Sequence, residues 1–205
     1  MNWLRALQAR FETASDPVMI GGQVVNALAS NPYAIASQFI VDIGCRYHNS
    51  NPDSARFLTA NNLAVATEFF GAQGGFSTAF RITASEDREL CGRWLHRGYR
   101  IIYAPEIVVY HAHVLTWRTF WQQHFTYGRG AFQLQRTRLR EGWVLFKPDL
   151  RYYADLLLRP LAPPITWRSL RLLGLVVESQ SASTFGMIAE WLRSRNERIS
   201  STLDV

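Results

Sequence analysis

Cysteine and long apolar runs are both scarce in this sequence. The two cysteines, Cys45 and Cys91, show neither the spacing of a zinc site nor the density of a disulfide-rich secreted domain. Such usage fits a reducing compartment. No window reaches ~18 consecutive apolar residues, the length of a membrane-spanning helix. The closest candidate, residues 170–192, is interrupted by an arginine, two glutamates and a glutamine, so we expect no membrane-spanning segment.

Lysine is almost absent as well, since Lys147 is the only lysine among 22 basic residues. The charge is also uneven: residues 1–92 carry 6 Lys+Arg and 8 Asp+Glu, whereas residues 93–205 carry 16 and 8, so the net charges are −2 and +8. Arginine favours planar anionic partners such as phosphates. The basic half therefore suits a nucleotide diphosphate or an anionic membrane surface, unless it is a solvated face.

What is present is enough for one folded domain with an appendage: 205 residues, 48% of them hydrophobic. Apolar residues at three- and four-residue spacing predict helices over residues 3–11, 33–47, 68–72, 83–97 and 117–138. Apolar β-branched runs predict strands over residues 18–25, 57–65, 99–103 and 107–110. Thr83 and Glu86 have capping-box spacing, and Gly98 suits the end of the same helix. The fold class is α/β.

An acidic pair, Glu86 and Asp87, opens the clearest predicted helix. Carboxylates stabilise a helix N-terminus because the dipole and the free N–H groups favour negative charge there. The same position also fixes a side chain at a pocket rim, where it can act as a general base. Both interpretations remain open from the spacing alone.

Two further clusters carry polar chemistry. His111 and His113 are two residues apart and so share one face of a strand, where they suit a metal ion or are simply half-exposed. Asn61 and Asn62 offer donors and acceptors for sugar hydroxyls, and also suit an ordinary turn. Arg129 stands between two glycines, which favours either a phosphate contact or a kinked helix with a surface arginine.

The order of these segments resembles the acceptor half of a family 2 glycosyltransferase with the GT-A fold, over roughly residues 1–135. The residues that carry the resemblance are Asn61-Asn62-Leu63-Ala64, Gly74-Gly75-Phe76, Glu86-Asp87-x-Glu89-Leu90, Gly98-Tyr99-Arg100-Ile101, Pro105-Glu106-x-Val108-Val109-x-His111 and Tyr127-Gly128-Arg129-Gly130. As an ordered set they are specific, although each alone is weak.

The resemblance implies roles for individual residues. Asp87 matches the catalytic base of inverting transfer, and Glu86 matches its neighbour in the pocket. His111 matches a histidine that completes the coordination of a divalent metal, Mn²⁺ or Mg²⁺, on the donor diphosphate, with His113 as second choice. Many processive relatives carry a Gln-x-x-Arg-Trp motif where this chain has Arg129, and that motif is absent here.

The resemblance also implies a missing part. Family members begin with a nucleotide-binding half that ends in Asp-x-Asp, and this chain contains no Asp-x-Asp. We therefore expect a partial GT-A-like (Rossmann-like) domain that lacks its N-terminal nucleotide-binding half. Residues 1–148 would form the acceptor and catalytic-base half, and residues 149–205 a basic helical tail. The missing half would belong to a longer chain or to a partner chain, and the metal is expected only in a complete enzyme.

The expected function is sugar transfer from a nucleotide-diphosphate sugar to a hydroxyl acceptor, in cell-surface glycan synthesis. The alternative is a non-catalytic interaction or membrane-surface module derived from such an enzyme. No nucleic-acid motif is present, so nucleic acid is not an expected partner. Apolar faces edged by arginine in the tail suit a membrane interface or a packed appendage. We expect a cytoplasmic protein, peripheral to the inner face of the cell membrane.

Overall fold

The computed structural model describes residues 3–14, 17–80, 84–144 and 149–203, with side chains as far as residue 197 in the last helix. Two predictions fall outside these ranges: the helix cap at Thr83 and the end of the first domain at residue 148. The division into residues 1–148 and 149–205 therefore stays a prediction.

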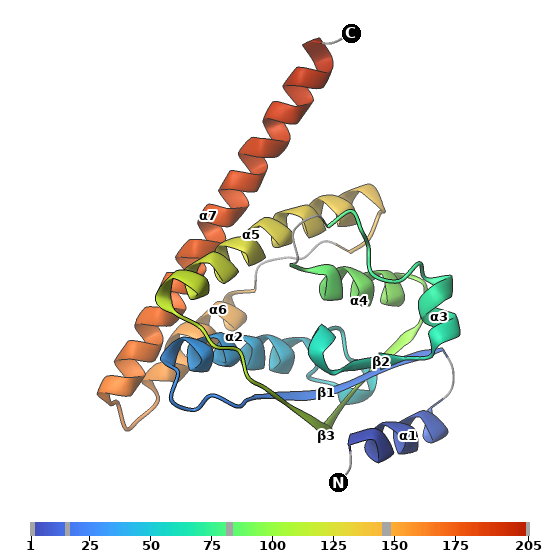
Figure 1. Cartoon of the computed structure of the whole chain (residues 1–205), viewed down its shortest axis with the longest axis horizontal. Coiled ribbons are helices and arrows are strands. Elements are labelled where there is room, and N and C mark those ends of the chain that lie inside the picture. Colours follow the sequence, from blue (N-terminus) through green and yellow to red (C-terminus); the bar gives the residue numbers. More distant parts are fainter. Residues whose placement is uncertain (1–2, 15–16, 81–83, 145–148, 204–205) are drawn as a thin grey trace.

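A small mixed sheet lies at the centre, with strand order β2-β1-β3 (Figure 1). β1 (Val18–Asn26) pairs antiparallel with β2 (Leu63–Val65) and parallel with β3 (Arg100–His111). The prediction of two strands around Pro105 is wrong, because β3 runs through it with a register shift opposite Gly22. A Cβ at Gly22 would lie 1.9 Å from the Ile107 carbonyl oxygen, so this strand pair needs glycine there.

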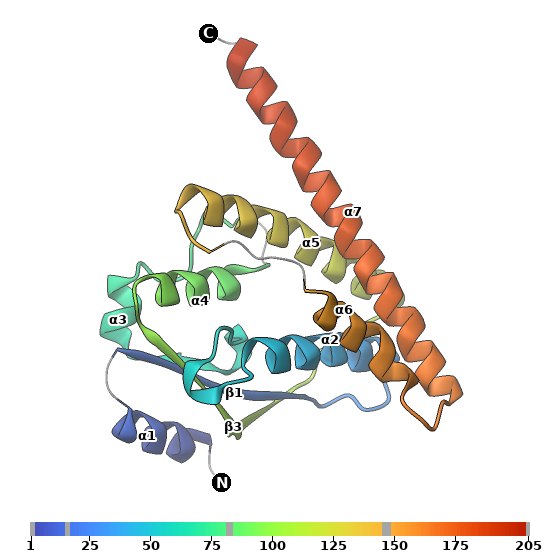
Figure 2. The same cartoon turned by 180° about the vertical axis from the view of Figure 1, so that it is seen from behind.

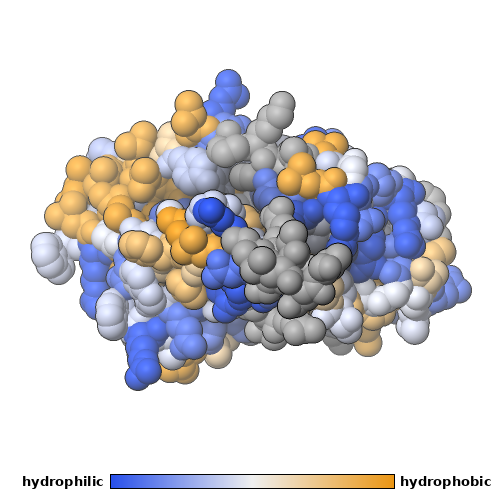
Figure 3. All heavy atoms as spheres, turned by 90° about the horizontal axis from the view of Figure 1, so that it is seen from above, coloured by the Kyte–Doolittle hydropathy of each residue, from blue (hydrophilic) through white to orange (hydrophobic). Residues whose placement is uncertain are grey.

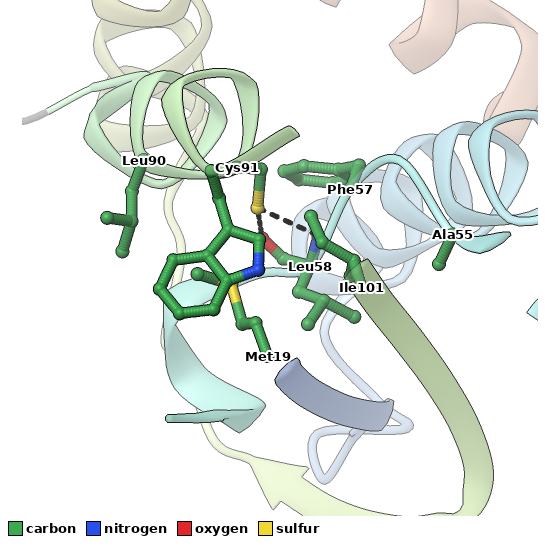
Figure 4. Packing of buried hydrophobic residues seen from close by; sticks show 8 residues of the cluster. Met19, Ala55, Phe57, Leu58, Leu90, Cys91 and Ile101 are labelled. Carbon is green, nitrogen blue, oxygen red and sulfur yellow. Dashed lines mark hydrogen bonds between the residues drawn. The ribbon is translucent and has the colours of Figure 1, made fainter. Parts of the chain in front are cut away.

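Helices cover both faces of the sheet because alternate strand residues point to opposite sides. α1 (Trp3–Thr13) covers one face. Its cluster contains Ala6, Leu7, Val18, Ile20, Ile102, Ala104 and Ile107. α4 (Glu86–His96) covers the other. Its cluster contains Met19, Ala55, Phe57, Leu58, Leu90, Cys91, Trp94 and Ile101 (Figure 4). The predicted strand over residues 57–65 is real only at β2, since η2 (Ala60–Asn62) precedes it.

α4 is fixed to the layer below it by polar as well as apolar contacts. The Cys91 thiol donates to the Leu58 carbonyl (3.7 Å) and accepts from the Leu58 amide (3.4 Å), as the dashed lines in Figure 4 show. Burial raises the pKa of Cys91 to about 12, so this thiol is structural rather than reactive. The helix ends as predicted, with Gly98 at φ +82° and its N–H on the Leu95 carbonyl (3.0 Å).

A second group of helices packs beside this layer: α2 (Pro32–His48), α5 (Trp117–Arg140), α6 (Leu150–Leu158) and α7 (Trp167–Leu203). The short α3 (Thr67–Ala72) lies near the C-terminal end of α4 (Figures 1 and 2). One cluster joins α2, α5 and α7 through Ala36, Leu115, Phe120 and Leu175. Another joins α2, α6 and α7 through Ile43, Leu156 and Val176. The tail is helical, as predicted, and it packs on the rest of the chain.

Glycines let α5 and α7 touch backbone to backbone. A Cβ at Gly128 of α5 would lie 1.8 Å from the Ser183 carbonyl oxygen, and one at Gly186 of α7 would lie 2.0 Å from the Phe125 carbonyl oxygen. Ser183 adds a hydrogen bond from its hydroxyl to the His124 carbonyl (3.0 Å). The glycine expected to bring backbone towards a ligand brings it towards another helix instead.

α7 is also the one helix in the described ranges that is long and apolar enough to cross a membrane by length and composition. The qualifying stretch is Trp167–Glu197, whose most apolar window has a mean hydropathy of 1.2 and is 22% buried. The sequence analysis did not identify this helix as a candidate span, because an uninterrupted apolar run is a stricter criterion than mean hydropathy. The helix contains Glu178 and Glu190, and Glu190 is only 1% exposed.

The contact between α5 and α7 predicts a large effect of one methyl group. Gly128→Ala should destabilise the fold by roughly 1–3 kcal/mol or more, because the new Cβ overlaps the backbone of α7. Gly174→Ala is the matched control, since a Cβ there meets nothing within 4 Å, and helix propensity should make it neutral or stabilising by up to about 1 kcal/mol. Urea unfolding of both variants measures the difference. Equal stabilities would contradict the close packing.

Candidate active site

The acidic pair lies in the first turn of α4, as predicted, but the helix starts differently. Its N-cap is Ser85, which has a left-handed φ of 72° and makes no side-chain cap hydrogen bond. The predicted capping box between Thr83 and Glu86 lies partly outside the described residues, within which Glu86 is the first residue of the helix. A left-handed serine costs free energy, and such residues often cluster at functional sites.

Asp87 is held from two sides. Its Oδ1 accepts a hydrogen bond from the Arg88 amide at 2.7 Å, and a backbone hydrogen bond also joins it to Ala60 in η2. Burial raises the pKa of the Asp87 carboxyl, and this outweighs the opposite effects of Arg88 and of the two backbone hydrogen bonds. A carboxylate with a raised pKa holds a proton more strongly and is a better general base.

Glu86 has an orphan acceptor. Its Oε2 atom is buried and has no hydrogen-bond partner in the part of the chain that the structure describes. Buried carboxylate oxygens normally find donors, so an exception at this position distinguishes Glu86 from an ordinary helix-stabilising residue. The acidic pair thus divides its roles: Asp87 is hydrogen-bonded, whereas Glu86 has unused accepting capacity.

Tyr127 of α5 joins this site, which the sequence did not reveal. Burial raises the pKa of Tyr127 and outweighs the opposite effect of the hydrogen bond from Gln123. The negative charges of Asp87 and Glu86 raise the pKa further, so the Tyr127 hydroxyl lies within electrostatic reach of both. Gln123 donates to the Tyr127 hydroxyl at 2.8 Å and to the Ser37 hydroxyl at 3.2 Å. The spacing of four residues between Gln123 and Tyr127 was the available signal, since it places both on one helix face.

The two predicted sugar-binding asparagines separate. Asn61 is exposed, whereas Asn62 is only 2% exposed. The Asn62 amide donates to the carbonyls of Gln23 (2.9 Å) and Ile107 (2.8 Å) and accepts from the Trp3 indole (3.0 Å). With its amide used in this way, Asn62 holds α1, β1 and β3 together, and Asn61 is the residue free to meet a ligand.

Arg129 faces the tail. Its Nε donates to Glu190 Oε2 of α7 at 2.9 Å, and Gln133 and Arg193 donate to the same carboxylate. Burial tends to raise the pKa of Glu190, but these hydrogen bonds outweigh it and hold the pKa at about 2. The structure therefore gives Arg129 an ion pair with α7, where the sequence suggested a substrate.

His111 and His113 lie at the end of β3 with ring centroids 5.7 Å apart. Burial and the neighbouring His111 lower the pKa of His113. Among the residues that the structure describes, no three His, Cys, Asp or Glu side chains lie close enough to hold a metal ion. The pair offers two nitrogen donors, whereas Mg²⁺ and Mn²⁺ prefer carboxylate, carbonyl and water oxygens. These two residues do not by themselves fit the expected metal site.

A buried histidine of α5, His124, packs against the Tyr127 ring. His124 is 3% exposed, its Nε2 has no partner among the described residues, and its ring lies 4.5 Å from that of Phe120 and 5.5 Å from that of Tyr127. Burial lowers the pKa of His124 to about 4. It is therefore a neutral packing residue at pH 7.

Comparison with known proteins gives one match. The family model described as Glycosyl transferase family group 2 matches residues 24–192, which include α4, α5 and most of α7. No curated protein and no solved structure matches the chain.

His124 predicts a pH dependence of stability. Its folded pKa of about 4 lies below the unfolded value of 6.5, so the unfolded state binds more protons between these pH values and stability falls as the pH drops. His124→Leu should reduce the loss between pH 7 and pH 4 by about 3 kcal/mol. Denaturant unfolding at several pH values tests this. If the free energy of unfolding fell by the same amount between pH 7 and pH 4 in parent and variant, His124 would not be buried as described.

Proposed function

The chain belongs to glycosyl transferase family group 2, and from this premise we propose that it supplies the acceptor site and the general base, Asp87, of an enzyme that transfers a sugar from a nucleotide-diphosphate donor to an acceptor hydroxyl. Membership of the family supports glycosyl transfer in general. The choice of donor, the inverting course and the role in cell-surface glycans are parts of the proposal.

The single observation that carries the proposal is the position of Asp87. It is fixed in the first turn of α4, and burial raises its pKa. In the proposed step Asp87 takes the proton of the acceptor hydroxyl while that oxygen attacks the anomeric carbon. The new C–O bond forms on the face opposite the diphosphate, and the bond from the anomeric carbon to the diphosphate oxygen breaks with its electron pair.

Neighbouring residues support this step. Tyr127, which accepts a hydrogen bond from Gln123, lies within electrostatic reach of the carboxylates and is suited to orient the hydroxyl that Asp87 deprotonates. Asn61, on the exposed side of η2, is suited to bind acceptor hydroxyls next to Ala60. We derive no step through a metal, because His111 and His113 alone do not fit one.

The catalytic assignment predicts the behaviour of Asp87→Asn. The variant should fold normally and lose transfer by roughly 10²–10⁴-fold, because an amide cannot accept the proton. Asp53→Asn is the matched control, since Asp53 is an exposed carboxylate in the turn η1 (Pro52–Ser54). Transfer from labelled UDP- and GDP-sugars by membranes of expressing cells gives the readout. Near-parental transfer by a folded Asp87→Asn protein would refute the assignment.

A second proposal concerns location: the tail attaches the protein to the inner face of the cell membrane. Large apolar side chains stay exposed on α7 and just before it, with Trp167 80% exposed. The others are Leu158, Ile165, Leu170, Val177, Phe185, Met187, Ile188, Trp191 and Leu192. In Figure 3 apolar side chains gather on the left, the side where α7 and the start of α5 lie in Figure 1. Exposed Arg168 and Arg171 flank this apolar face.

Attachment through this face predicts salt-sensitive binding to anionic vesicles. Trp167→Ala should weaken it by removing an interfacial anchor, and Arg168→Gln with Arg171→Gln should each remove about 1 kcal/mol. Tyr110→Ala is the control, since the Tyr110 side chain is exposed to a similar extent as Trp167 but lies on β3. Point variants are preferable to removing the tail, because α7 contributes to the core. Equal co-sedimentation of all variants, or none with the parent, would contradict the proposal.

A further inference from the structure

Three arginines lie within electrostatic reach of one imidazole, that of His48. His48 lies at the end of α2, and the three arginines whose charges act on it are Arg56 from the loop after η1, Arg88 from α4 and Arg138 from the end of α5. Burial lowers the pKa of His48 to about 4, and the positive charges of Arg88, Arg138 and Arg56 contribute in that order. All three guanidinium groups therefore lie within electrostatic reach of the same ring.

Direct contacts support this arrangement. Arg88 stacks over the Phe57 ring, with its guanidinium carbon 5.2 Å from the ring centroid. The Phe57 ring lies 6.2 Å from the His48 ring, and the Arg56 amide donates to the His48 carbonyl at 3.2 Å. Arg138 approaches from α5, where burial and the charge of Arg88 lower its pKa. Elements far apart in the sequence thus bring three guanidinium groups within electrostatic reach of one imidazole, and one of them stacks on the neighbouring Phe57 ring.

Several other arginines of the chain form ion pairs with carboxylates. Arg93 holds Glu89, and Arg129 and Arg193 hold Glu190. Within the described ranges no carboxylate forms an ion pair with Arg56, Arg88 or Arg138. Arg56 and Arg88 are exposed, so a ligand can reach them. Like charges held close together repel one another. Asp87 offsets part of the charge of Arg88, and a bound anion would relieve the remaining repulsion.

We propose that Arg56, Arg88 and Arg138 form a binding site for a phosphate group, next to Asp87. Guanidinium groups bind phosphate oxygens in pairs, and three of them within electrostatic reach of the same imidazole can meet a doubly charged phosphate ester. Arg88 directly follows Asp87, so the phosphate would be carried by the molecule whose hydroxyl faces Asp87. The acceptor is then a phosphate ester. Phosphate binding at this site does not depend on Asp87 being the base, whereas the assignment of that phosphate to the acceptor rests on the proposed function.

Inorganic pyrophosphate is the probe, and calorimetric titration of the purified full chain at low salt is the measurement. The parent should show saturable binding that weakens as salt rises. Arg88→Gln, and separately Arg56→Gln and Arg138→Gln, should weaken binding about tenfold each. Arg136→Gln is the matched control, because it lies on α5 two residues from Arg138 and so points to a different side of the helix. Thermal unfolding of each variant verifies that it is folded.

Two further ligands identify the source of the phosphate. Glycerol 3-phosphate presents a phosphate monoester, and UDP presents the diphosphate of a donor. Binding of both, with equal sensitivity to Arg88→Gln, supports a site that recognises the phosphate itself. If Arg88→Gln weakened the binding of UDP but not that of glycerol 3-phosphate, the site would belong to the donor diphosphate and the proposal would be overturned. Absence of saturable pyrophosphate binding, or equal weakening by Arg136→Gln, would also overturn it, and neither result bears on Asp87.

Discussion

The site depends on how closely α5 approaches its neighbours, and two glycines set this distance. Gly128 and Gly130 are two residues apart and so face opposite sides of the helix. Gly128 touches α7, whereas a Cβ at Gly130 would lie 2.5 Å from the Ala84 carbonyl oxygen and 2.9 Å from the Ser85 hydroxyl. Ala84 and Ser85 directly precede the acidic pair. One helix therefore fixes both the tail and the start of α4.

This constraint explains the chemistry of the first turn of α4. With α5 against residues 84 and 85, and η2 bonded to Asp87 through Ala60, the carboxyl is removed from much of its water. Its pKa rises in consequence, and the left-handed Ser85 and the orphan Glu86 oxygen are further costs of the same arrangement. The apolar docking of α4 through Leu90, Cys91 and Trp94 offsets such costs.

Local sequence patterns predicted the elements well and their partners poorly. Apolar spacing located α1, α2, α4, α5 and β1 to within a few residues, and Gly98 marked the end of α4 correctly. The ladder through Pro105 was missed because a register shift in β3 depends on its neighbour β1. Arg129 was assigned to a ligand because its partner Glu190 lies 61 residues away. The contacts of Asn62 and Gly128 could not be predicted for the same reason: a residue type shows which contacts it can make, and only tertiary packing shows which one it makes.

The central claim is that packing around the start of α4 makes Asp87 a stronger base than an ordinary aspartate. Titration of the Asp87 side-chain carboxyl by ¹³C NMR tests this without any substrate. The account predicts a pKa clearly above 3.8, the ordinary value for aspartate, because burial outweighs the neighbouring Arg88 charge. A pKa at or below 3.8 would show that Asp87 is a solvated, charge-paired helix residue and would contradict the account.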